Sequence, residues 1–260
     1  MNEPSLRTIL LATDGSPDAA LAARAAVDLC QQTGARLHVV HAWRLPMLAA
    51  AGTGPGYPDR PDTGHTSDYE AYERQAEQVL TDELVALRHA GLHGVVEHLC
   101  EGRPAEQIVQ LGATLPADLI VIGSRGLGPV RRLVLGSVSE GVVHAATCPV
   151  LVLRGGPDAW PPRWLVIGDD GSPTASRAAT LAARLGQYFQ SHAVLVHSTP
   201  DLPRAPYQTA AEQQQQRDTA LQEAEVALAL QAQRLTPLLG QPPARRVSID
   251  DPARLLIATA

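Results

Sequence analysis

The sequence predicts an α/β protein, with an open, mostly parallel sheet covered by helices on both faces and a second, incomplete copy of the same unit after it. Two observations carry this prediction. Short apolar runs alternate with longer helical patterns over residues 8–153, as in parallel sheets whose strands are joined by helices. In addition, the run Thr8–Pro17 returns as Arg163–Pro173, with Asp14 and Asp170 separated by 156 residues. So long a period indicates duplicated domains rather than a solenoid.

Each copy begins with an apolar strand that runs into Asp-Gly-Ser-Pro. Ser16 and Ser172 are natural N-caps, and Pro17 and Pro173 would take the first helical position, so an alanine-rich helix is expected after each strand. A second strand is then expected in each copy, at Arg36–Ala42 and Ala193–His197.

The rest of the first copy continues the alternation. Leu45–Thr66 is rich in Pro and Gly and has no periodicity, which predicts a loop. Helices and strands then alternate from a long helix to a fifth strand: Ser67–Ala90, Gly94–Glu101, Pro104–Thr114, Leu119–Ile122, Ser137–Ala146 and Pro149–Leu153. Arg154–Arg163 is again rich in Gly and Pro and is expected to link two domains, residues 1–154 and 163–260.

The second copy runs out early. A long helix, a third strand and a last helix are expected at Thr209–Thr236, Arg245–Ile249 and Pro252–Thr259. The fourth strand, the glycine-rich segment, the fourth helix and the fifth strand have no counterpart in this sequence. The sequence leaves open whether this half is truncated or degenerate.

The composition of the chain argues against several classes of function. The formal charge of −6 argues against nonspecific nucleic-acid binding, and no apolar run is long enough to suggest a membrane span. The beginning of the sequence lacks a secretory pattern, and the odd number of widely spaced cysteines predicts reduced thiols, so a cytoplasmic protein is expected. All 21 basic residues are arginine, which excludes a P-loop lysine, a Schiff-base lysine and a lysine general base.

The most informative segment is Gly123-Ser-Arg-Gly126, followed after nine residues by Gly136-Ser137. It lies between a predicted strand and a predicted helix, where backbone N–H groups can approach phosphate oxygens and the helix N-terminus favours negative charge. It is neither GxGxxG, because Arg131 stands where the third glycine belongs, nor GxxxxGK[ST]. The segment therefore predicts a nucleotide site of another kind.

Two further interpretations stay open at this segment. Ser137-Val-Ser-Glu140 fits a capping box, so Ser137 could cap the helix, bind phosphate or do both. Arg125, Arg131 and Arg132 are possible phosphate contacts, although loop arginines are often only solvated.

Asp14 follows the first strand, at the edge where open α/β sheets bind ligands. It could hold a ribose hydroxyl or a Mg²⁺ ion that bridges phosphates, or it could simply stabilise the turn before the helix. No nucleophilic triad is recognisable, and no catalytic residue is predicted.

Together these motifs identify a family resemblance. Asp14-Gly-Ser-Pro, the pattern Gly-x2-Gly-x9-Gly-Ser and the final Cys148-Pro-Val-Leu-Val-Leu153 closely resemble the universal stress protein family over residues 5–154. The second copy resembles the N-terminal two-thirds of the family pattern. The resemblance implies an open, Rossmann-like, five-stranded parallel sheet in the order 3-2-1-4-5, with ATP across the carboxyl ends of strands one and four.

The resemblance also assigns ligand contacts residue by residue. Ala12, Thr13 and Asp14 would line the ribose side, and Ala42 would contact adenine through its backbone. Ribose and phosphates would be held by Gly123, Gly126, Gly136, Ser137 and Val138. Ala42 departs from the bulkier valine that is common in the family, and Pro129 in the nine-residue spacer is a smaller departure.

The expected function is a cytoplasmic ATP-binding regulator of the stress response with one nucleotide site per chain. A slow Mg-dependent ATPase and a nucleotide-independent interaction scaffold are the alternatives. Family members tend to pair through the fifth strand, and the second copy offers no fifth strand, so a homodimer through Pro149–Leu153 is expected. Its downstream protein partner is not named by the sequence.

Overall fold

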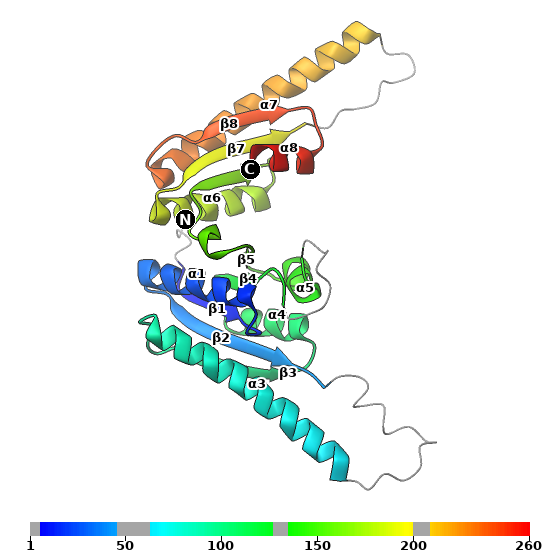
Figure 1. Ribbon diagram of the computed structural model, residues 1–260. Helices are drawn as coiled ribbons and strands as arrows, with labels where there is room; N and C mark the ends of the chain where they lie inside the picture. The colour runs from blue at the N-terminus through cyan, green and yellow to red at the C-terminus, as the bar shows by residue number, and fades with distance from the viewer. Residues whose placement is uncertain (1–5, 46–62, 127–134, 200–208) are drawn as a thin grey trace, which may run out of the picture. The chain divides into compact units, whose positions relative to one another are not determined.

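The computed structural model describes residues 6–45, 63–126, 135–199 and 209–260. These form two compact units, Met1–Trp160 and Pro161–Ala260, each with its own sheet (Figure 1). The sheet of the first unit has five parallel strands in the order β3-β2-β1-β4-β5, as expected. Its elements are β1 (Thr8–Ala12), α1 (Pro17–Thr33), β2 (Arg36–Trp43), α3 (Thr63–His89), β3 (Val96–Glu101), α4 (Pro104–Thr114), β4 (Leu119–Gly123), α5 (Ser137–Ala145) and β5 (Val150–Leu153).

The central strand explains why the sequence of β1 is continuously apolar. Helices α1 and α3 pack on one face of the sheet and α4 and α5 on the other (Figure 1). Alternate residues of a strand point to opposite faces, so both sets must be apolar when both faces are covered. Ile9, Leu10 and Leu11 are accordingly fully buried. Leu10 lies in one cluster with Ile108 of α4 and Val142 of α5.

Several element bounds differ from the sequence prediction. Helix α3 begins at Thr63 rather than Ser67, which leaves residues 46–62 of the expected loop outside the described residues. Strand β3 begins at Val96 because Gly94 has a φ of +76°, a turn conformation. The expected linker also contains an ordered part, since Pro157–Ala159 form a short 3₁₀ helix. Trp160 behind it is buried, and its Nε1 donates to Asp28 Oδ2 of α1 at 2.9 Å.

The second unit repeats the first three strands. Its parallel sheet has the order β6-β7-β8, with α6 and α7 contacting the sheet and α8 contacting β6 and β7. The elements are β6 (Trp164–Gly168), α6 (Pro173–Phe189), β7 (His192–Ser198), α7 (Ala210–Leu239), β8 (Ala244–Ser248) and α8 (Pro252–Thr259). Strand β6, the counterpart of the central β1, is an edge strand among the described residues, and its Trp164 is 65% exposed.

Corresponding residues of the two units are separated by one of two constant offsets in the sequence. From β6 through β7 each position lies 156 residues after its counterpart, so α1 and α6 begin at Pro17 and Pro173. In the following elements the offset is 148, because the connection between the second strand and the long helix is shorter: Ala76, Leu80 and Leu87 of α3 correspond to Ala224, Leu228 and Leu235 of α7. All six are buried.

Among the described helices, none combines the length and apolarity of a membrane span.

Candidate nucleotide site

Thr13, directly after β1, is held through each of its polar groups. Its N–H donates to the Val40 carbonyl at 3.0 Å, and its own carbonyl lies 2.8 Å from His41 Nδ1, both on β2. Its hydroxyl donates to Glu83 Oε2 of α3 at 2.6 Å. The chain therefore leaves the sheet in one fixed direction, and this direction decides where Asp14 lies.

The next three residues form the turn into α1. Asp14 Oδ1 accepts a hydrogen bond from the Ser16 N–H at 3.1 Å, and Gly15 has a φ of +73°, which a side chain would disfavour. Ser16 caps α1, since its hydroxyl accepts from the Ala19 N–H at 3.2 Å, and Pro17 is the first helical residue. The N-cap expected from the sequence is confirmed, and Asp14 stands half-exposed at the carboxyl edge of the sheet.

Two glycines of the glycine-rich segment allow close approaches. A Cβ atom on Gly123 would lie 2.6 Å from the Asp18 carbonyl carbon and 2.7 Å from the Ala19 nitrogen, both backbone atoms of α1. A Cβ atom on Gly126 would collide with the carboxylate of Asp14. Gly123 therefore lets β4 end against α1, whereas Gly126 leaves room for a side chain that faces the site.

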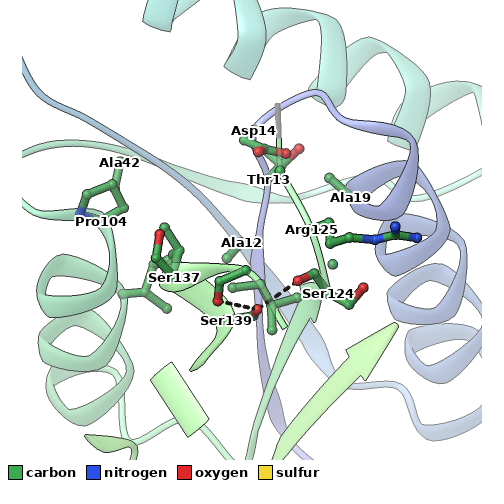
Figure 2. Close-up of a pocket in the computed structure, with 16 residues that line it drawn as sticks. Ala12, Thr13, Asp14, Ala19, Ala42, Pro104, Ser124, Arg125, Ser137 and Ser139 are labelled. Atoms are coloured by element: carbon green, nitrogen blue, oxygen red, sulfur yellow. Dashed lines mark hydrogen bonds between the residues drawn. The ribbon is translucent and has the colours of Figure 1, made fainter. Parts of the chain in front are cut away.

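Ser124 and Arg125 join the segment to its surroundings. Ser124 is buried, and its hydroxyl donates to Asp18 Oδ2 at 2.7 Å, while its carbonyl accepts from the Gly136 N–H at 2.7 Å. The Arg125 carbonyl accepts from the Ser16 hydroxyl at 3.1 Å. The Arg125 side chain extends toward α1, with Nε 3.6 Å from Asp18 Oδ2 (Figure 2).

The N-terminus of α5 differs from the capping box expected at Ser137. Gly136 is the N-cap and makes no side-chain capping bond, and Ser137 is the first helical residue. The serine of the pattern that is buried is Ser139, whose hydroxyl lies 2.9 Å from the Ser124 carbonyl and 3.0 Å from that of Gly136. The first backbone bond within the helix joins the Glu140 N–H to the Gly136 carbonyl. The N–H groups of the three preceding residues have no partner inside the helix and remain available to an anion.

These elements surround one cavity of about 390 Å³ (Figure 2). The nine ligand-contact residues predicted from the sequence all line it, and Arg125 does so as well: Ala12, Thr13, Asp14, Ala42, Gly123, Gly126, Gly136, Ser137 and Val138. Arg131 and Arg132 lie outside the described residues. The sequence prediction missed six lining residues: Ala19, Pro104, Ile108, Ile122, Ser124 and Ser139.

The lining contains both apolar and polar groups. Pro104, Ile108 and Val138 form an apolar wall of the cavity. Pro104 lies near Ala42, and Asp14 and Ser137 add polar groups to the lining (Figure 2). Among the described lining residues there is no His, Cys or Lys. The arrangement is suited to hold a ligand with an apolar ring and an anionic end.

One buried carboxyl adjoins the site. Burial raises the pKa of Glu83 above its ordinary value, and the nearby Asp14 carboxylate acts in the same direction, whereas the hydrogen bond from Thr13 opposes the shift. Its place on α3 was missed in the sequence, although Glu83 falls on the apolar stripe between Leu80 and Leu87. A carboxyl at a core position was the available signal.

The second unit repeats the turn that follows the first strand. The Asp169 N–H donates to the Val196 carbonyl at 2.9 Å, and His197 Nδ1 lies 2.6 Å from the Asp169 carbonyl. Hydrogen bonds from the hydroxyl and N–H of Ser172 lower the pKa of Asp170. The three described strands of this unit include no counterpart of β4, so a second wall like that of the glycine-rich segment is absent from the described residues.

Comparisons with known proteins agree with the sequence resemblance. The sequence pattern of the universal stress protein family matches residues 5–154. A universal stress protein of Thermus aquaticus is 43% identical over 148 residues, which are 57% of this chain and 98% of that protein. A universal stress protein of Mycobacterium tuberculosis is 34% identical over 154 residues, 58% of this chain and 47% of the relative. The matched region thus spans about half of the mycobacterial protein.

Some solved structures align with nearly the whole chain. A universal stress protein from Archaeoglobus fulgidus is 17% identical, and the alignment covers 97% of this chain and 82% of that one with a TM-score of 0.62. At this identity the likeness concerns the fold.

Proposed function

The chain belongs to the universal stress protein family, and on that premise we propose that its first unit binds one ATP molecule, with Mg²⁺, and acts as a cytoplasmic regulator of the stress response. The observation that carries the proposal is the N-terminus of α5, which has no side-chain cap and opens on a cavity that Asp14 also lines. A bound phosphate would accept from the N–H groups that a capping side chain would otherwise occupy.

The residues present fit such a ligand. Adenine would lie against the apolar wall and reach the backbone of Ala42, and ribose would lie near Ala12, Thr13 and Asp14. The phosphates would be held by the glycine-rich segment and the start of α5: Gly123, Gly126, Gly136, Ser137 and Val138. Arg125 could reach a phosphate only by giving up its approach to Asp18.

Charge supports a role for Mg²⁺. Asp14 would face a polyphosphate, and the repulsion between these groups requires a cation between them. Bound Mg²⁺ would supply that charge and hold the phosphates in one geometry. Phosphate oxygens would supply ligands beside Asp14, and among the described residues no group of three or more metal-ligating side chains is assembled.

Calorimetry with ATP, ADP and AMP tests the proposal. Gly126→Val places a side chain against Asp14 inside the cavity and should weaken ATP binding by at least about tenfold. Gly156→Val is the matched control, because Gly156 has an ordinary extended backbone and a Cβ there meets no atom within 4 Å. Absence of ATP binding by the unaltered chain, or equal affinity in Gly126→Val, would refute the proposed site.

We also propose that two chains pair through β5. This strand is the edge of the five-stranded sheet, and Val150, Leu151 and Val152 are only half-buried in it. An apolar edge strand with unpaired backbone groups favours pairing with another chain. Light scattering at micromolar concentration should give twice the 27.6 kDa chain mass, and a monomer mass would contradict the proposal.

A further inference from the structure

A buried carboxyl supports the turn that carries Asp14. Glu83 of α3 is 8% exposed, and its Oε2 accepts a hydrogen bond from the Thr13 hydroxyl at 2.6 Å, across 70 residues of sequence. Burying a carboxyl costs free energy unless its oxygens are hydrogen-bonded, so a protein that keeps a carboxyl in its core usually gains something from it. Here Glu83 ties a helix to the residue that precedes Asp14.

The hydrogen bond between Thr13 and Glu83 complements the hydrogen bonds that β2 makes to Thr13. Val40 and His41 hold the main chain of Thr13, whereas Glu83 holds its side chain from the opposite element. Three contacts from two elements fix both the position and the rotation of Thr13. Because Asp14 is the next residue, the direction of its carboxylate depends on this arrangement.

The surroundings of Glu83 are charged. Asp14 faces it from the turn, Arg24 and Asp28 line the same groove from α1, and Asp82 precedes it on α3. Glu83 therefore lines a groove that shares Asp14 with the cavity and includes none of the described residues of the glycine-rich segment.

The duplicated unit provides an internal comparison. At the offset of 148 residues, Glu83 corresponds to Gln231 of α7, which is also buried. Gln231 makes its hydrogen bonds to Ser176 and Arg234, at 3.4 and 3.2 Å. The counterpart of Thr13 is Asp169, which accepts instead from the Gly171 N–H at 2.8 Å. The hydroxyl–carboxyl pair is therefore found in the unit that has the cavity and is replaced in the other.

We propose that Glu83 is a positioning residue of the nucleotide site, which acts by holding the Thr13 hydroxyl so that Asp14 presents its carboxylate to the bound nucleotide. This inference rests on the proposed function of the same site. Glu83 itself does not touch the ligand, since it does not line the cavity. Its effect on affinity passes through Thr13 and Asp14.

The test is ATP affinity, with Mg²⁺ present, in single and double variants of the full chain. Glu83→Ala and Thr13→Val each remove the tie and should weaken binding about tenfold, whereas Glu83→Gln keeps an oxygen acceptor for Thr13 and should stay within about threefold of the unaltered chain. In an Asp14→Ala background, Glu83→Ala should weaken binding no further, because the group through which it acts is gone. Gln231→Ala in the second unit is the control and should leave affinity unchanged.

Each outcome separates the two proposals. If the unaltered chain binds no ATP, the proposed function fails and this inference falls with it. If the unaltered chain binds ATP and Glu83→Ala binds equally well, the inference alone is wrong. A loss in Glu83→Ala that persists in the Asp14→Ala background, or one that Glu83→Gln does not restore, would show that Glu83 supports the fold generally rather than Asp14.

Discussion

Replacing Ser16 by alanine should cost more than the same change at its repeat counterpart, Ser172. Both serines cap a helix, through hydrogen bonds from the Ala19 and Ala175 N–H groups at 3.2 and 3.0 Å. Ser16 also donates to the Arg125 carbonyl at 3.1 Å and is only 2% exposed. The Ser16 hydroxyl therefore joins the start of α1 to the glycine-rich segment, whereas the Ser172 hydroxyl caps α6 and donates no such second bond to any described residue.

The difference in magnitude follows from these contacts. Loss of a serine N-cap costs about 1 kcal/mol, which is the expected effect of Ser172→Ala. Ser16→Ala loses a similar cap and also the bond to Arg125, worth about 1 kcal/mol more in a partly buried setting. The total for Ser16→Ala is therefore about 2 kcal/mol.

Native-state hydrogen exchange read by mass spectrometry reports each helix separately. Amides of α1 should lose about 2 kcal/mol of protection in Ser16→Ala, and amides of α6 about 1 kcal/mol in Ser172→Ala. The glycine-rich segment should also exchange faster in Ser16→Ala. Equal losses in the two variants, or unchanged exchange of the glycine-rich segment, would refute the coupling of the cap to that segment.

Two pH dependences follow from the shifted pKa values. Burial raises the pKa of Glu83 above its ordinary 4.5, so at pH values between the two the folded chain holds a proton that the unfolded chain has released. The free energy of unfolding should therefore fall as pH rises above 4.5 through the raised pKa. Glu83→Gln should remove that fall in denaturant titrations at a series of pH values. His38 Nδ1 and His98 Nε2 lie 2.9 Å apart, and burial, with the neighbouring charge of His98 as a second cause for His38, lowers the pKa of each histidine below 6.5. The contribution of these histidines to the free energy of unfolding is complete above pH 6.5 and is lost as pH falls through their lowered pKa values. His98→Gln should therefore make stability decline less steeply with falling pH. An equally steep decline in that variant would contradict this assignment.

Local signals in the sequence were sufficient for the sheet and for the caps of α1 and α6. Apolar runs, Asp-Gly-Ser-Pro and the repeat period define elements that depend on neighbouring residues alone. The order 3-2-1-4-5 came from the family resemblance, and the structure shows the same order. The predicted ligand-contact residues lie together because each follows a strand end or begins a helix at the same edge of the sheet.

The prediction failed where the outcome depends on distant contacts. The pattern Ser137-x-x-Glu140 fits a capping box with Ser137 as the N-cap, but the N-cap lies one position earlier, at Gly136, whose N–H donates to the carbonyl of Ser124. The bond between Ser124 and Asp18 spans 106 residues, and that between Trp160 and Asp28 spans 132. No local sequence pattern predicts such pairs, because they form only when the sheet brings distant segments together.

The number of nucleotide sites per chain tests the central claim most directly. Equilibrium dialysis of the full chain with ATP and Mg²⁺ should saturate at one ATP per chain, because the glycine-rich segment and α5 occur once while the Asp-Gly-Ser-Pro turn occurs twice. Saturation at two would show that the turn alone, shared by Asp14 and Asp170, makes a site. No bound ATP would contradict the assignment of the cavity.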